Sequence, residues 1–99
     1  MRYDREALFQ TVEEQYQPNG DYSETVVEEH TEYCSVAYTD LQTMHLVYGA
    51  IRQGSLTIHL QNYIGYDFNR IVIDGKPYVV DDEIDLRFKK VYVISELQG

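Results

Sequence analysis

The sequence is poor in several residue types that would mark a particular class of protein. It has one cysteine, Cys34, among 99 residues, which excludes an internal disulfide framework and fits a reducing compartment. No apolar run approaches the roughly 20 residues that a membrane-spanning helix needs. Residues 1–5 carry three charges where a signal peptide would need apolar residues. We therefore expect a soluble protein that is made in the cytosol and contacts no membrane.

Basic residues are also scarce, with 8 lysines and arginines against 17 acids and a net charge of −9. Residues 1–40 hold ten acids and two bases (−8), whereas residues 41–99 hold seven acids and six bases (−1). Such a surface repels phosphates, so we do not expect the protein to bind DNA or RNA. The simplest interpretation of the acidic half is a solvated surface that keeps the protein soluble.

Patterns that would indicate catalysis or a cofactor are missing. There is no glycine-rich phosphate loop and no basic stripe interleaved with aromatic residues. Cys34 lies in a strand pattern, where a cysteine is more often a small buried apolar residue than a thiolate. His30, His45 and His59 fall in separate elements without the spacing of zinc ligands. We expect a protein that is not an enzyme and that binds no cofactor or metal.

An acidic stretch at residues 81–85 raises the alternative of a cation site. Its four carboxylates lack the glycine and the terminal glutamate of an EF-hand loop. A solvated connector between two strands is therefore favoured, and a calcium site remains the alternative.

The clearest local pattern is a β-hairpin at residues 71–80, IVIDGKPYVV. Its Asp74-Gly75 pair accepts the positive φ angles of a type I′ turn. Further strands are predicted at residues 7–14, 22–38, 55–61 and 91–97, the second of them one long bent strand or two strands broken near His30. A β-bulge is the expected cause of the bend.

Residues 40–54 change to a helical period, with apolar residues spaced three, four and three apart. Asp40 is the predicted N-cap and Gly54 the C-terminal stop, while Gly49 weakens the helix interior. The sequence thus predicts a mainly β protein: one domain over residues 1–99, a small antiparallel barrel or sandwich with one short helix or long loop around residues 40–54. The predicted core residues are Leu56, Ile58, Leu60, Ile71, Ile73, Val79, Val93 and Ile94.

The order of these features resembles the head-completion, or stopper, proteins in the neck of tailed phages, also called head–tail joining or minor capsid proteins. The resemblance begins at MRYDREALFQ and continues through TVVEEHTEYCSVAYTD, LQTMHLVYGAIRQG and SLTIHLQN. It is greatest in DFNRIVIDGKPYVVDDEIDLRFKKVYVISEL, where the family carries a hairpin of the form I-x-I-D-G-K-x-Y-x-V before a final apolar strand.

This resemblance implies a structural protein of the virion, assembled in the host cytoplasm. Such proteins are small barrels that form a homo-oligomeric ring between the portal–adaptor above and the tail terminator below. They retain the packaged DNA without reading its sequence and offer a docking surface to the tail. An acidic lumen would suit this use, because DNA would pass without adhering.

Two other interpretations stay open. The acidic first half could imitate the phosphates of DNA, in a phage-encoded inhibitor that occupies a nucleic-acid groove. Alternatively, the chain could be a small β interaction module with no role in a phage.

The helix segment is the candidate contact site, because connections of this length between strands are usually functional. The expected role is an oligomer contact or a channel gate, and the competing interpretation is a helix that only covers one end of the barrel. The candidate residues are Met44, Leu46, Val47, Tyr48, Ile51 and Arg52.

The charge distribution yields a first prediction. The isolated chain should show no salt-sensitive binding to duplex DNA, because its net charge of −9 opposes contact with phosphates. Fluorescence anisotropy with labelled duplex across a salt series checks this. Micromolar binding at physiological salt that weakens steeply with added salt would contradict it.

Overall fold

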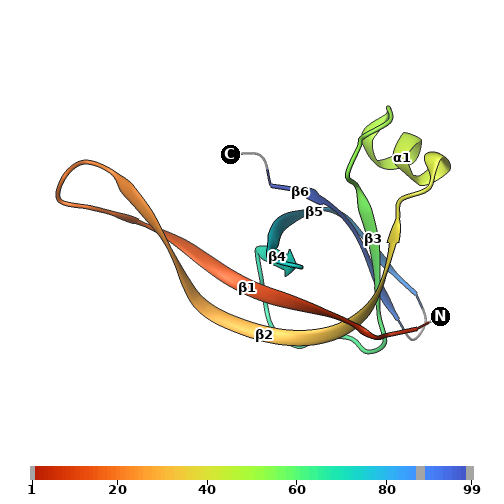
Figure 1. The fold of residues 1–99 in the computed structure, drawn as a ribbon, viewed down its shortest axis with the longest axis horizontal. Coiled ribbons are helices and arrows are strands. Elements are labelled where there is room, and N and C mark those ends of the chain that lie inside the picture. Colours follow the sequence, from red (N-terminus) through yellow and green to blue (C-terminus); the bar gives the residue numbers. More distant parts are fainter. Residues whose placement is uncertain (1, 87–88, 98–99) are drawn as a thin grey trace.

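Antiparallel strands make up most of the protein, which a computed structural model describes at residues 2–86 and 89–97. These residues form six strands and one helix (Figure 1). Their bounds are β1 Arg5–Tyr16, β2 Tyr22–Tyr38, α1 Leu41–Tyr48, β3 Leu56–Leu60, β4 Arg70–Ile73, β5 Lys76–Asp85 and β6 Lys90–Glu96. Every strand pairing is antiparallel, so the predicted mainly β class is confirmed.

The strands form a closed barrel in the order β1-β2-β3-β6-β5-β4. Closure depends on β4, whose Val72, Ile71 and Arg70 lie opposite Leu8, Phe9 and Gln10 of β1. Because β1 pairs with β4, neither strand leaves an open sheet edge along the paired residues.

The barrel interior is filled by alternate side chains from all six strands. Phe9 is fully buried and meets Phe68 and Tyr92 edge-to-face, with ring centroids 4.8 and 6.1 Å away. The core cluster comprises Ala7, Phe9, Cys34, Ile58, Leu60, Ile71, Ile73, Tyr78, Tyr92 and Ile94.

Most of the predicted core is confirmed. Ile58, Leu60, Ile71, Ile73, Val93 and Ile94 are buried, and Leu56 is half-buried against the cluster. Val79 was predicted wrongly: it is only half-buried, whereas its neighbour Tyr78 is buried and Val80 packs on the core. Because Tyr78, Val79 and Val80 are all apolar, the sequence does not show which of these alternating side chains point into the barrel.

The predicted hairpin turn is confirmed, since Asp74 and Gly75 have φ angles of 52° and 78°, as a type I′ turn requires. The strand after it is longer than predicted. Residues 81–85 are not a connector but the second half of β5, paired with β6 as far as Asp85↔Lys90. The pairing jumps from Val80↔Ile94 to Asp82↔Val93, which makes Asp81 a bulge residue.

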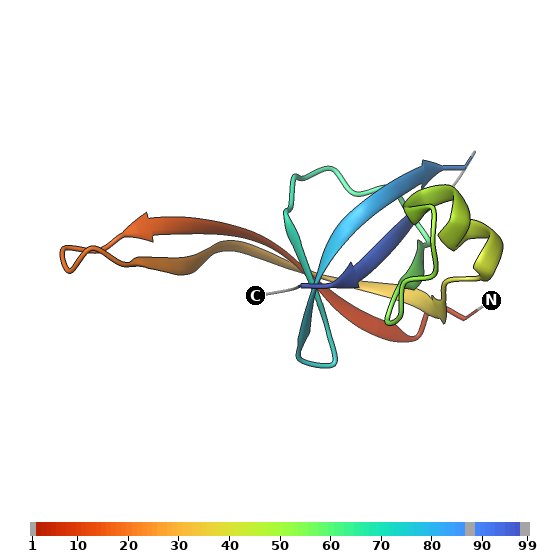
Figure 2. The same cartoon turned by 90° about the horizontal axis from the view of Figure 1, so that it is seen from above.

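The β1–β2 hairpin extends far beyond the barrel (Figures 1 and 2). β2 is one continuous strand, and its pairing with β1 jumps from Thr11↔Glu28 to Val12↔Val26. Val27 is thus the extra residue of a bulge, as predicted for the bend in this strand. The hairpin gives the molecule extents of 47 × 30 × 22 Å.

The helix begins where predicted and ends earlier. Asp40 is the N-cap, and its carboxylate accepts a 2.7 Å hydrogen bond from the Thr43 amide, which lowers the pKa of Asp40. The predicted stop at Gly54 is wrong, because α1 ends at Gly49, whose φ of 72° is left-handed. A glycine that weakens a helix interior is also the residue that most readily ends it.

A core substitution tests the inward alternation of the hairpin. Ile73→Ala should lower the free energy of unfolding by roughly 2–4 kcal/mol, because it empties part of a fully packed interior. Val79→Ala, on the half-buried side of the same hairpin, is the matched control and should cost clearly less. Urea unfolding followed by circular dichroism measures both. Equal losses would contradict the assignment of the inward face.

Candidate functional site

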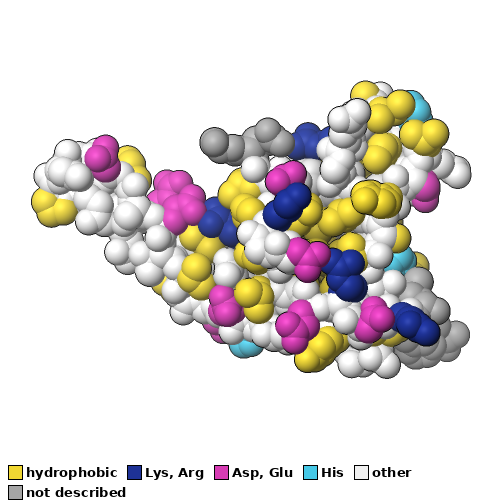
Figure 3. Space-filling view, viewed as in Figure 1, with side chains coloured by type: hydrophobic (Ala, Val, Ile, Leu, Met, Phe, Trp, Pro, Cys, Tyr) yellow, Lys and Arg dark blue, Asp and Glu magenta, His cyan; other side chains and the backbone are white. Residues whose placement is uncertain are grey.

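The protruding part of the hairpin, residues 12–28, is the most exposed element, and we call it the arm. It carries five acids and no lysine or arginine. Among them lie exposed apolar side chains, with Tyr16 67% and Tyr22 68% accessible and Val26 and Val27 about half accessible. Figure 3 shows hydrophobic and acidic side chains along the arm. A two-stranded hairpin is marginal alone in water, and the exposed apolar side chains make the arm the candidate contact surface of the described chain.

The tip of the arm is held by local contacts. The Gln17 amide donates to the Asp21 carbonyl at 2.6 Å, and the Gly20 amide donates to the Gln17 carbonyl at 3.0 Å. Tyr16 and Tyr22 lie opposite each other and meet edge-to-face at 5.4 Å. Gly20 takes a φ of 92°, which a residue with a side chain adopts only with strain.

Asn69 fixes the base of the arm. Its side-chain carbonyl accepts from the Val12 amide and its side-chain NH₂ donates to the Val12 carbonyl, both at 2.8 Å. The side chain thereby continues the β4 ladder one step along β1. Thr11 donates to the Asp67 carbonyl at 3.1 Å, and Arg70 pairs with Glu24 at 2.7 Å. This ion pair lowers the pKa of Glu24.

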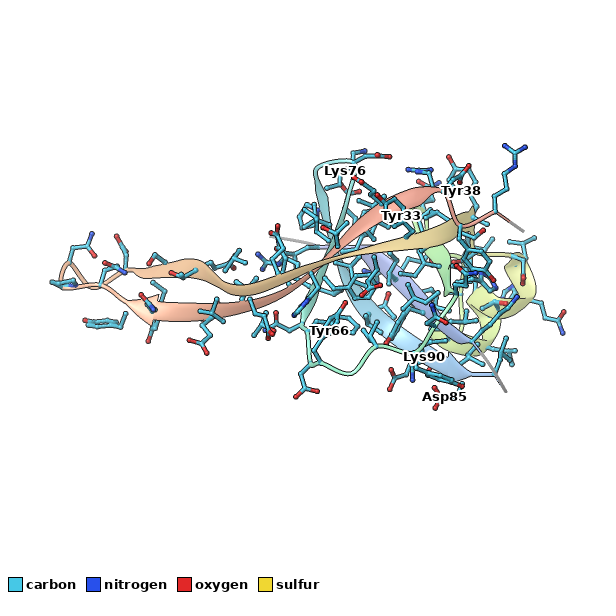
Figure 4. All side chains as sticks on the ribbon, turned by 90° about the horizontal axis from the view of Figure 1, so that it is seen from below. Tyr33, Tyr38, Tyr66, Lys76, Asp85 and Lys90 are labelled. Atoms are coloured by element: carbon cyan, nitrogen blue, oxygen red, sulfur yellow. The ribbon has the colours of Figure 1, made fainter. Side chains whose placement is uncertain are left out.

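An aromatic contact supports the β2 side of the arm base. The His30 ring stacks on Tyr66 with centroids 3.8 Å apart, and its Nε2 lies 2.9 Å from Glu28. The Tyr66 hydroxyl donates to Glu32 at 2.7 Å. Burial and this hydrogen bond raise the pKa of Tyr66. Figure 4 shows Tyr66 beside the point where the arm leaves the barrel.

The structure divides the six predicted contact residues of the helix segment, residues 40–54, into two groups. Leu46 is 80% and Ile51 64% accessible, so these two side chains face solvent. Met44 is buried, and Val47, Tyr48 and Arg52 are half-buried. Nearby Leu41 and Tyr38 add further exposed apolar surface.

Tyr48 attaches the helix segment to the barrel. Its hydroxyl donates to the Asp81 carboxylate at 2.6 Å and lies 3.1 Å from the Ser55 hydroxyl. Burial is the main reason why the pKa of Tyr48 is raised, and the hydrogen bond to Asp81 raises it further. The bulge in β5 is what places Asp81 outside the regular pairing. The Arg52 guanidinium lies over the ring of this tyrosine, 5.4 Å from the ring centroid.

The residues considered for catalysis or metal binding do not come together. Cys34 is buried in the core, and burial raises the pKa of its thiol to about 11, so it stays protonated at neutral pH. His30, His45 and His59 lie on β2, α1 and β3. Within residues 2–86 and 89–97, no group of three or more His, Cys, Asp or Glu side chains could hold a metal ion.

A hollow of about 390 Å³ lies beside the barrel, lined by aromatic residues that include Tyr66, Phe68 and Tyr92. Lys90 stands at its edge and pairs with Asp85 and, at 3.2 Å, with Glu83. The hydrogen bond to Asp85 raises the pKa of Lys90. Lys90 is thus paired with two carboxylates of β5. Asp67 also lines the hollow, so its charged lining is mainly acidic.

Comparison with known proteins identifies the fold alone. No family model and no curated protein matches the sequence. The solution structure of protein SF1141 from Shigella flexneri 2a, a structural genomics target, is similar, with a TM-score of 0.69 and 18% sequence identity. The match covers 96% of this chain and 93% of that one. In the described part of the chain, no helix is long and apolar enough to cross a membrane.

Asn69 provides a test of how the arm is held. Asn69→Leu should lower the free energy of unfolding by about 1 kcal/mol, because two exposed hydrogen bonds are lost. Amide hydrogen exchange should quicken in residues 12–16 and stay unchanged in β6. Asn62→Leu, an exposed residue of the same loop, is the control. Unchanged exchange in residues 12–16 would show that Asn69 does not hold the arm.

Proposed function

We propose that the chain is a structural protein of a phage neck, of the head-completion type. In this proposal, copies form a ring beneath the portal–adaptor, retain packaged DNA and provide the surface on which the tail docks. The ring belongs to the virion and assembles in the host cytoplasm. It has no enzymatic activity and needs no cofactor.

The observation that supports this proposal best is a closed barrel with exposed apolar surface at both ends of its long axis. The arm extends from one end and the helix segment lies at the other (Figures 1 and 2). The barrel closes its own sheet, so it offers no open strand edge where it is closed, and the arm and the helix segment carry the most exposed apolar side chains beyond its wall. A subunit that must contact neighbours and further proteins needs several such surfaces.

The composition of the arm favours a protein partner over imitation of DNA. A phosphate mimic needs regularly exposed carboxylates, whereas the acids of the arm alternate with Tyr16, Tyr22, Val26 and Val27, all exposed. Aromatic side chains of this kind dominate the energetics of protein interfaces. The remaining acids would still discourage adhesion of DNA to the ring.

Two shortened variants test the proposal. In the arm variant, Asn-Gly replaces residues 14–24. Because Asn69 binds the backbone of Val12 on its outer edge, the backbone groups of Glu13 face β2. A two-residue turn therefore closes the Glu13–Thr25 pair. In the helix variant, a Gly/Ser turn joins Thr39 to Ser55.

The wild-type chain should bind portal–adaptor complexes of the phage that encodes it and protect DNA-filled heads from nuclease. Both variants should lose assembly while circular dichroism shows that the β fold persists. Electron microscopy of the complexes and nuclease protection are the measurements. A wild-type chain that leaves the complexes bare would refute the neck function. If the helix variant still assembles and retains DNA, the helix segment only covers the barrel.

A further inference from the structure

The strand register places Tyr16, Tyr22 and Val26 of the arm on one face, whereas Val27 is the unpaired residue of the bulge. Residues directly opposite in an antiparallel pair share a face, and the pairs Val12↔Val26, Glu14↔Glu24 and Tyr16↔Tyr22 alternate with polar pairs. One face of the arm therefore carries an aromatic pair, an acidic pair and a valine pair in succession. The other face carries Glu13, Gln15, Ser23 and Thr25.

In the acidic pair on this apolar face, Glu14 and Glu24, only one carboxylate has a cationic partner in the described chain. Like charges directly opposite each other destabilise a sheet. Glu24 pairs with Arg70 at 2.7 Å, but Glu14 has no ion-pair partner among the described residues. A cation set among apolar side chains would complement this face.

The helix segment carries the complementary features. Between residues 41 and 54 there is no acid, and Arg52 is present. In the described part of the chain Arg52 contacts the Tyr48 ring and no carboxylate. Next to it in sequence, Ile51 is 64% accessible, and Leu46 lies exposed on α1.

We propose that the apolar face of the arm docks on the helix segment of a second copy of this chain. Tyr16 and Tyr22 would cover Leu46 and Ile51, and Arg52 would pair with Glu14. This inference rests on the proposed function, because it supplies the contact between neighbouring subunits of the ring.

Neither a contact between two arms nor one between two helix segments explains both surfaces. Two arms packed face to face would bring together ten carboxylates and no lysine or arginine, which opposes association. Two helix segments packed together would leave both arms uncovered. A contact between unlike ends is heterologous, so successive copies close into a ring or continue as a filament.

The arm and the helix segment can be disabled separately. Tyr16→Thr with Tyr22→Thr removes the aromatic pair and keeps residues that favour strands. Leu46→Gln with Ile51→Gln removes the two apolar side chains assigned to the contact and keeps a helix-forming residue in α1. Tyr33→Thr removes an aromatic side chain of similar exposure, 57%, from the barrel wall (Figure 4) and is the control.

Sedimentation velocity up to millimolar concentration, at low and high salt, is the measurement. The wild type and the control should form multimers, and each double variant alone should stay monomeric. An equimolar mixture of the two double variants should form one-to-one dimers, because it contains one intact pair of surfaces. A mixture that stays monomeric overturns the inference, as does self-association of either double variant at the wild-type level.

A charge exchange tests the ion pair. Arg52→Glu and Glu14→Arg should each weaken assembly roughly tenfold, since each places like charges in the contact. Both changes in one chain should restore it. A wild type that is monomeric throughout refutes this contact, yet it could still cap portal–adaptor complexes. The neck function fails only if those complexes stay bare, so the two failures are distinguishable.

Discussion

The pairing of β4 with β1 is the constraint on which the rest of the structure depends. It closes the barrel through three residues of a twelve-residue strand, Leu8 to Gln10. From Val12 to Tyr16, β1 continues past the barrel with only β2 beside it as a strand, and this excess length is the arm. The Asn69 side chain binds Val12 at the end of the β1–β4 pairing. This short pairing therefore closes the barrel around the core and sets the residue at which the arm begins.

Closure also explains how the surface is divided. A barrel that satisfies its own backbone groups offers partners no open strand edge where it is closed. Five of the ten acids in residues 1–40 lie on the arm, together with Tyr16 and Tyr22. The helix segment, residues 40–54, instead presents Leu46 and Ile51, and its single acid in sequence is the N-cap Asp40. The charge imbalance between the two parts of the chain thus becomes a difference between two ends of one molecule.

Much of the fold could be predicted because its signals are local. Asp74-Gly75 specifies a turn whatever surrounds it, and Asp40 caps a helix through its own backbone neighbours. The helix segment could be proposed as a contact from its composition, but the sequence did not separate Leu46 and Ile51, which face solvent, from Met44, which is buried. That division depends on where the barrel wall lies.

The sequence by itself determined where most strands lie, the hairpin turn, the helix start and the excess of acid in the first half, because each follows from residues close together in the chain. Tertiary structure alone decided that residues 12–28 form an arm, that Val79 lies outside the core and that residues 81–85 pair with β6. These outcomes depend on which strand lies beside which. Alternating residues look the same in a strand with two neighbours and in a strand with one, and only closure of the barrel distinguishes them.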